Sequence, residues 1–215
     1  GGGVVNVVPD YARIWTRVRD SKRDGVLEVY ERVKQIAAGA AMMAEVEHEL
    51  RLVSGVYELL PNRAGGAAIQ KNLEALGPIE YTAEETAFAM QIQAATGGKQ
   101  TGLDGTIKPM EETREHPDGG STDVGDVSWI APVVRLSATT AAGNTPWHSW
   151  AVVACGGMSI GHKGMLYAAK ALSLTMVDLY QDAELRAAVR AEFEERKGDA
   201  VYEPMLPPGP PPIPE

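Results

Sequence analysis

Cysteine is almost absent from this chain of 215 residues, and Cys155 is the single example. No disulfide can therefore form within the chain, and a reducing, cytoplasmic compartment is expected. Cys155 ends the apolar run 151–155. Because free cysteine is commonly buried, we expect this residue to be a small part of the core.

Basic clusters and long apolar runs are missing as well. The net charge is −9, the sequence pI is about 5.0, and the 20 Lys and Arg residues are scattered. Nucleic acids and anionic membranes require clustered positive charge, so neither is an expected partner. No apolar stretch approaches the ~20 residues that cross a bilayer, and no signal peptide is visible. The chain begins Gly-Gly-Gly rather than with Met, so residue 1 is not expected to be the natural start.

Histidine is scarce, with His48, His116, His148 and His162 as its four positions. The sequence contains neither His-Glu-x-x-His nor Cys-x-x-Cys. A catalytic zinc needs three protein ligands and an open position, so this chain alone is not expected to form a complete metal site. His48 falls on the apolar face of an alternating segment, which predicts a core or interface residue. His116 lies in a polar loop and is expected to be inert.

The hydrophobic pattern predicts an α/β fold. Helical spacing and cap signals predict helices after Ser21, after Asn62, from Thr82, from Gly161 and from Asp182. Alternation or short apolar runs predict strands. The predicted strands are residues 4–8, 11–19, 46–60, 127–131, 133–139 and 150–155. Residues 201–215 are rich in proline and are expected to form an extended, exposed arm.

Three segments follow one another in an informative order: Gly119 to Trp129, Asn144 to Trp150, and Ser159 to Met165. The first is rich in small residues, the second places a histidine between two tryptophans, and the third places a histidine at a helix start. They resemble the C-terminal active-site segments of the zinc amidohydrolases of the aminoacylase/carboxypeptidase family. Asn6-Val7-Val8-Pro9, followed by an arginine thirteen residues after Asn6, adds to the resemblance, which runs from Val4 to about Lys197.

This resemblance implies a domain organisation. Residues 1–62 would be the second half of a lid and dimerisation domain, which is half of a ferredoxin-like (α+β) unit. Residues 63–200 would be the C-terminal part of a zinc-exopeptidase-like catalytic domain, followed by the tail 201–215. A homodimer formed through the lid domain is implied as well.

The resemblance also implies roles for particular residues. His148 would be the last metal ligand of the family. The residues that would bind substrate are Asn6, Arg19, Gly120, Ser121, Thr122 and His162. From the residues alone, alternatives stay open: His148 as a packed histidine, Arg19 as a surface arginine easily confused with Arg17, and Ser121-Thr122 as ordinary turn chemistry.

No catalytic residue is expected in this chain, because the family carries its general-base Glu and most ligands in an N-terminal half. The chain would be a fragment, a truncated product or one chain of a two-chain enzyme, and inactive by itself. The complete enzyme would hold two zinc ions, or another divalent metal such as manganese. It would cleave the amide bond of N-acyl or N-aroyl amino acids, with p-aminobenzoyl-glutamate as the lead candidate.

Two other functions compete with this interpretation. The chain could be a non-catalytic binding or assembly subunit that pairs through its ferredoxin-like half. It could also be a non-hydrolytic regulator that binds a small carboxylate through Arg19 and Ser121 without metal.

Overall fold

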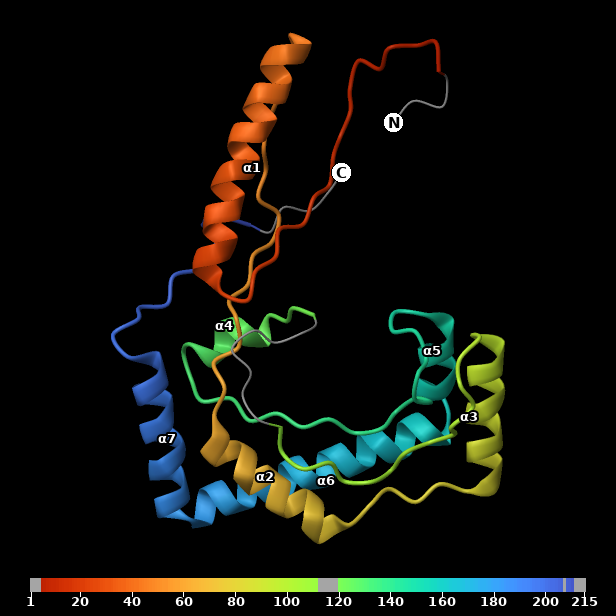
Figure 1. Ribbon diagram of the computed structural model, residues 1–215. Coiled ribbons are helices and arrows are strands. Elements are labelled where there is room, and N and C mark those ends of the chain that lie inside the picture. The colour runs from red at the N-terminus through yellow and green to blue at the C-terminus, as the bar shows by residue number, and fades with distance from the viewer. Residues whose placement is uncertain (1–4, 112–119, 207, 211–215) are drawn as a thin grey trace. The chain divides into compact units, whose positions relative to one another are not determined.

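The structure is a computed structural model that describes residues 5–111, 120–206 and 208–210 (Figure 1). The chain forms two compact units. Within the described residues, unit 1 comprises 5–58, 120–123 and the residues from 203 on, and unit 2 comprises 59–111 and 124–202. Each unit is described by itself. The domain identities expected for residues 1–62, 63–200 and 201–215 stay predictions.

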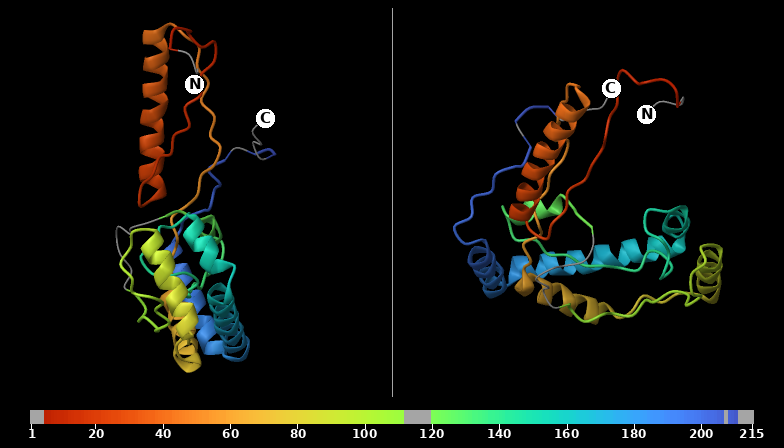
Figure 2. Two further views of the ribbon diagram at one scale, coloured as in Figure 1. Left: turned by 90° about the vertical axis from the view of Figure 1, so that its right-hand side faces the viewer. Right: turned by 45° about the horizontal axis from the view of Figure 1, so that its top comes forward.

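Unit 2 is built from helices around one long central helix, α6. Its helices are α2 (Arg63–Leu76), α3 (Ala83–Ala95), α4 (Val124–Ser128), α5 (Trp150–Gly156), α6 (Ser159–Gln181) and α7 (Ala183–Lys197). α2 lies beside α6, and α7 packs against both of them, whereas α5 packs on the other end of α6 (Figures 1 and 2).

The helix ends of unit 2 follow from local sequence signals. Thr82 caps α3 by accepting a hydrogen bond from the Glu85 N–H at 3.2 Å, while the Glu85 carboxylate accepts one from the Thr82 N–H at 2.7 Å. This capping box satisfies two backbone donors that the helix leaves unpaired. Asp182 caps α7 through the Leu185 N–H, and Gly77 ends α2 with a φ of 76°, which suits glycine.

Buried amides tie α2 to its neighbours. Asn72 donates to the Thr175 hydroxyl at 3.1 Å and to the Asp178 carboxylate at 2.8 Å, which joins α2 to α6. Asn62 caps α2 and also donates to the Val189 carbonyl of α7 at 2.8 Å. Because a buried amide without partners is costly, these bonds fix how the three helices pack.

The main apolar core of unit 2 lies where α3, α5 and the start of α6 meet. Its buried members are Ala89, Ile92, Ala142, Ala151, Cys155 and Ile160. Cys155 is fully buried and carries a free thiol, which confirms the prediction of a small core residue. At the junction of α5 and α6 the helices approach so closely that a Cβ on Gly161 would collide with the backbone of Gly156.

Unit 1 contains α1 (Arg23–Ala44) and extended segments on either side of it. Tyr57, which is buried, donates a hydrogen bond to the Glu203 carbonyl at 2.9 Å and accepts one from the Glu203 N–H at 3.2 Å. The Glu58 carboxylate accepts a hydrogen bond from the Arg23 N–H at 3.0 Å. Residue 203 of the proline-rich tail is therefore held against residues that precede α2.

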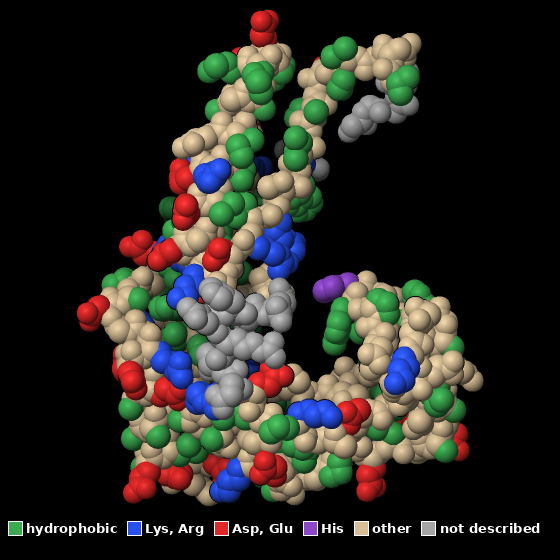
Figure 3. All heavy atoms as spheres, in the orientation of Figure 1, with side chains coloured by type: hydrophobic (Ala, Val, Ile, Leu, Met, Phe, Trp, Pro, Cys, Tyr) green, Lys and Arg blue, Asp and Glu red, His purple; other side chains and the backbone are tan. Residues whose placement is uncertain are grey.

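Unit 1 exposes many large hydrophobic side chains. The most exposed are Val5, Val8, Ile14, Trp15, Met42 and Met43. Figure 3 shows hydrophobic side chains open along α1 and along the N-terminal segment. Few side chains of this unit are buried, since Ala41 and Tyr57 are its only buried hydrophobic residues among those described.

The α/β prediction was wrong, because the described part of the chain contains helices and no strand or sheet. This overturns the expected α/β fold and its ferredoxin-like half. Of the predicted strands, 5–8, 11–19, 46–60 and 133–139 form no ladder, 127–131 overlaps the end of α4, and 150–155 lies within α5. Alternation is a local pattern, whereas a strand exists only if a second strand accepts its hydrogen bonds.

Two smaller predictions also need correction. Ser21 does not cap α1, whose N-cap is Lys22 with no side-chain hydrogen bond; instead the Asp20 carboxylate accepts from the Lys22 N–H at 3.0 Å. His48 is exposed, so it is not part of the core, and its expected place at an interface stays a prediction. Within the described residues, no helix is both long enough and apolar enough to cross a membrane.

Candidate functional site

His148 lies on a short turn between the buried Ala142 and the start of α5. The turn is closed by its own hydroxyls: Thr145 donates to the Ala142 carbonyl at 2.6 Å, and Ser149 donates to the Pro146 carbonyl at 2.6 Å. His148 itself is exposed. The turn therefore holds an imidazole in solvent on a backbone that is fixed by local hydrogen bonds.

The backbone of this turn adopts an unusual conformation at two residues. Asn144 has a φ of 58° and His148 a φ of 60°, which is the left-handed region. Asparagine and histidine are both enriched in this region, whereas for most residues it costs about 1–2 kcal/mol. Strained residues of this kind concentrate at functional sites, where the surrounding structure over-determines them. Among the described residues of unit 2, Asn144 and His148 are therefore the two non-glycine positions with this backbone geometry.

Exposed aromatic and aliphatic side chains flank His148. Trp147 is 74% exposed, Trp150 is 59% exposed, and Val153, one turn further along α5, is 73% exposed. Figure 3 shows hydrophobic side chains gathered at the end of unit 2 that holds α5. Exposed apolar surface that is clustered in this way is typical of an interaction site.

A buried amide on α3 reaches this turn. Gln93 is fully buried, and its side-chain nitrogen lies 2.8 Å from the carbonyl oxygen of Gly143, the residue before Asn144. The same nitrogen lies 3.1 Å from the Thr101 hydroxyl and 3.2 Å from the Gly102 carbonyl, and the side-chain oxygen accepts from the Gly102 N–H at 2.9 Å. One side chain therefore joins α3, the loop after it and the His148 turn.

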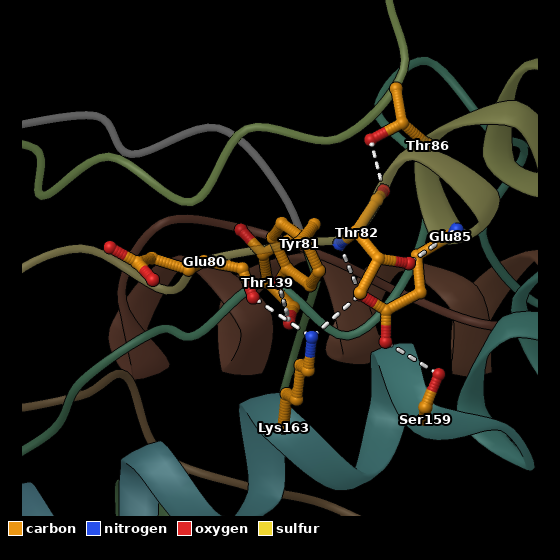
Figure 4. Close-up of polar contacts among 8 residues, drawn as sticks. All are labelled: Glu80, Tyr81, Thr82, Glu85, Thr86, Thr139, Ser159 and Lys163. Carbon is orange, nitrogen blue, oxygen red and sulfur yellow. Dashed lines mark hydrogen bonds and ion pairs between the residues drawn. The ribbon is translucent and has the colours of Figure 1, made fainter.

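The second histidine, His162, is exposed in the first turn of α6, and a network of charged groups fixes that turn (Figure 4). The Glu85 carboxylate accepts one hydrogen bond from Ser159 at 2.6 Å and another from the Lys163 ammonium, also at 2.6 Å. Lys163 also donates to the Glu80 carbonyl at 2.9 Å. The first turns of α3 and α6 are thereby locked together.

This network is not an activated nucleophile. The Lys163 ammonium, together with Ser159 and the Thr82 N–H, lowers the pKa of Glu85 from 4.5 to about 2. A carboxylate with so low a pKa is a poor proton acceptor at neutral pH, so it does not activate the Ser159 hydroxyl. Burial, and then the charge of Glu85, raises the pKa of Tyr81, whose phenol donates to the Thr139 carbonyl at 3.0 Å.

A shallow hollow of about 260 Å³ opens beside the network. Its wall combines the first turn of α3 with the start of α6, and most of it is apolar. The lining residues are Thr82, Glu84, Glu85, Phe88, Met158, Ser159 and Ile160. The carboxylate oxygens of Glu85 already accept hydrogen bonds from Ser159, Lys163 and Thr82. They are therefore weak acceptors for a ligand in this hollow.

The predicted site residues divide between the units. His148 and His162 lie in unit 2. Asn6, Arg19 and the segment 120–122 lie in unit 1, and all of them are exposed. Their roles in substrate binding and metal binding stay predictions. Gly119 and His116 fall outside the described residues.

The donors for a metal are incomplete in the described ranges. No group of three or more His, Cys, Asp or Glu side chains there is arranged to hold a metal ion. An exposed imidazole such as His148 has the chemistry of a single zinc ligand, but a catalytic zinc takes three. The residues present therefore fit one ligand position and not a whole site.

Sequence reasoning missed Gln93 and the role of Lys163. The capping box that contains Glu85 was readable from Thr82-Ala83-Glu84-Glu85. The partners of Gln93 and Glu85 were not, because Gly143 and Lys163 lie 50 and 78 residues away along the chain. No short-range pattern carries that information.

The comparisons with known proteins confirm the resemblance seen in the sequence. No protein-family profile matches the chain. No solved structure matches it either. The match to one curated protein is an alignment 232 positions long that covers 96% of this chain and 48% of the relative, so the chain spans about half the length of that protein. The partial match is consistent with a C-terminal portion. Over that length the chain is 35% identical to a subunit of the p-aminobenzoyl-glutamate hydrolase of Escherichia coli (strain K12).

Proposed function

We propose that this chain is part of a metal-dependent amidohydrolase that cleaves the amide bond of N-acyl or N-aroyl amino acids. The observation that carries the proposal is His148, an exposed imidazole on a left-handed backbone, at the place where the resemblance puts the last metal ligand. The name of the relative, a hydrolase of p-aminobenzoyl-glutamate, supports the reaction class and the lead substrate.

The proposed metal is zinc, or another divalent ion such as manganese, with two ions in the complete enzyme. His148 would supply one ligand, and the remaining ligands and the general base would lie outside the described residues, which hold no set of three donors. The bound metal would polarise the amide carbonyl and supply hydroxide. By itself the chain would then be inactive.

The proposed substrate contacts use this chain's own residues. Arg19 would pair with a substrate carboxylate, because a guanidinium presents two parallel donors. Asn6, Gly120, Ser121, Thr122 and His162 would hold further carboxylate or amide groups. The exposed rings of Trp147 and Trp150 would offer an apolar surface to an aroyl group.

The proposed assembly contains more than one chain. The relative is named as a subunit, which supports a second polypeptide, and the exposed apolar residues of unit 1 support pairing of two copies. A cytoplasmic location is proposed from the single free thiol of Cys155.

One alternative rests on the same exposed apolar residues of unit 1. The exposed hydrophobic residues of α1 and of the N-terminal segment favour a non-catalytic binding or assembly subunit. In that case His148 would bind no metal in any assembly. The two functions therefore differ in a measurable property of one residue.

The test uses the protein as its source cells assemble it, with every polypeptide that copurifies. Zinc content and hydrolysis of p-aminobenzoyl-glutamate are measured for the unaltered protein, for His148→Ala, and for the control His48→Ala, an exposed histidine of unit 1. We expect loss of metal and of hydrolysis in His148→Ala alone. Equal metal content and activity in all three proteins would refute the proposal.

A further inference from the structure

We propose that Gln93 is a positioning residue that sets the geometry at which His148 is presented. The effect on zinc binding and turnover rests on the proposed function. The claim that Gln93 holds the His148 turn does not. Gln93 is fully buried, and it acts through Gly143, five residues before His148.

The His148 turn is anchored at its first residues, Ala142 and Gly143. Ala142 is 4% exposed and packs in the core with Ala89 and Ile92 of α3. One residue later, the Gly143 carbonyl accepts the shortest hydrogen bond of the Gln93 side chain, at 2.8 Å. α3 therefore fixes both the position of the backbone at Ala142 and its orientation at Gly143.

The backbone that follows Gly143 adopts the left-handed conformation twice. Asn144 and His148 are both left-handed, with φ values of 58° and 60°. A left-handed conformation at a residue other than glycine persists only when its surroundings impose it. The Gly143 carbonyl belongs to the peptide bond that joins Gly143 to Asn144. The hydrogen bond from Gln93 therefore restrains the backbone at Asn144, the first of the two left-handed residues.

The position requires a glutamine, because its side chain must both donate and accept hydrogen bonds. The Gln93 amide donates to oxygens of Gly143, Gly102 and Thr101, and it accepts from the Gly102 N–H. A glutamate of the same shape would lose the donor and face those carbonyl oxygens with a buried charge. A methionine of similar size would leave the Gly143 carbonyl and the Gly102 N–H without partners.

The consequence concerns a ligand that must be held accurately. Groups that hydrogen-bond a metal-ligating side chain change metal affinity by about 10- to 100-fold when they are altered. Gln93 acts one step further from the metal, through the Gly143 carbonyl, and loss of this bond frees the peptide that leads into the His148 turn. We therefore expect its removal to weaken zinc binding and to lower kcat more than it changes KM.

The experiment compares Gln93→Glu and Gln93→Met with Asn72→Leu. Asn72 is a matched control, because its amide is also buried in unit 2 but joins α2 to α6 instead. Urea unfolding gives the stability of each variant. Backbone chemical shifts of Asn144 and His148 in the 215-residue chain report whether φ stays positive. Zinc affinity, kcat and KM are measured on the assembled protein.

We expect all three variants to lose stability. Only the Gln93 variants should lose the left-handed shifts of Asn144 and His148 and bind zinc more weakly than the unaltered protein does. Unchanged shifts and unchanged zinc affinity in a folded Gln93 variant would overturn the inference. If neither variant folds, backbone order parameters of the unaltered chain decide: a turn at 143–148 that moves freely on the nanosecond timescale would also overturn it.

The proposed function can fail separately. If His148→Ala keeps its zinc, the metal-ligand role is wrong, and no Gln93 variant should then affect zinc. The shifts of Asn144 and His148 would still show whether Gln93 holds the turn. The two ideas are thus distinguished by different measurements on the same set of variants.

Discussion

Glu85 and Lys163 join the first turn of α3 to the first turn of α6 through an ion pair of 2.6 Å. The glutamate side chain is 9% exposed and the lysine side chain 35% exposed. The pair stands beside His162, which follows Ser159 and precedes Lys163 on the same turn of α6. This link between two distant helix starts fixes the segment that presents the second histidine.

Replacing Glu85 should destabilise unit 2 in a pH-dependent way. Its folded-state pKa of about 2 lies below the ordinary 4.5, so its contribution is fully present above pH 4.5 and is lost as the pH falls toward 2. Glu85→Gln should lower the free energy of unfolding at pH 7 by roughly 1–2 kcal/mol. Urea unfolding of both proteins between pH 2 and pH 7 should show the difference shrinking in acid.

Glu84→Gln is the control for this series, because Glu84 is exposed on the same turn of α3, and its pKa is lowered by its own backbone N–H and the Thr82 hydroxyl rather than by an ion pair. Its effect should be clearly smaller than that of Glu85→Gln. A Glu85→Gln effect that is constant from pH 7 down to pH 2 would contradict the ionised network.

Thr82→Ala should lower the free energy of unfolding by about 1 kcal/mol, because it removes the cap of α3. The same change at Thr86, whose hydroxyl only donates back to the Thr82 carbonyl at 3.0 Å, is the matched control. Thr86→Ala should leave stability unchanged or slightly raise it, since alanine is the better helix former. Thermal unfolding followed by circular dichroism checks both, and equal losses would argue against the capping box.

His148→Gly should separate stability from function. Glycine relieves the left-handed strain but adds freedom to the unfolded chain, so the free energy of unfolding should change by less than about 1 kcal/mol. Zinc binding by the assembled protein should nevertheless be lost. Asn144→Gly, at the matching φ of 58°, should be as stable and keep its zinc. A stability loss well above ~1 kcal/mol for His148→Gly would mean that the imidazole packs against the protein.

Gly161→Ala should destabilise the junction of α5 and α6 by about 1–3 kcal/mol or more, because the added methyl group meets the backbone of Gly156. Gly39→Ala on α1 is the matched change without a neighbour, since nothing lies within 4 Å of its Cβ position. That variant should gain about 0.5–1 kcal/mol from helix propensity. Urea midpoints of the two variants should therefore move in opposite directions.

Most helices of unit 2 were predictable, because residues close in sequence to each helix end determine where it begins or ends. Thr82 with Glu85, Asp182, and Gly77 each act within four residues, and the structure places helix boundaries there. The site was less predictable. The exposure and backbone angle of His148 depend on Gln93 and on a core assembled from three helices, and sequence spacing contains neither.

The strands were mispredicted for a physical reason. Residues 11–19 alternate as a strand would, but in the described chain they pair with no neighbour and most of their side chains are exposed. Residues 150–155 are apolar enough for either a strand or a buried helix, and periodicity cannot separate the two over so short a run. Here they lie within α5, where Ala151 and Cys155 face the core one turn apart.

The fully buried thiol of Cys155 can report local opening of the core that surrounds it. A thiol reagent can react only when the core shared by α3, α5 and α6 opens, and each molecule can gain a single label because no other cysteine exists. The ratio of the labelling rate in the native protein to that in urea is then an equilibrium constant for this opening. The same core anchors the base of the His148 turn, so labelling followed by mass over time would report the fraction of molecules in which this core is open.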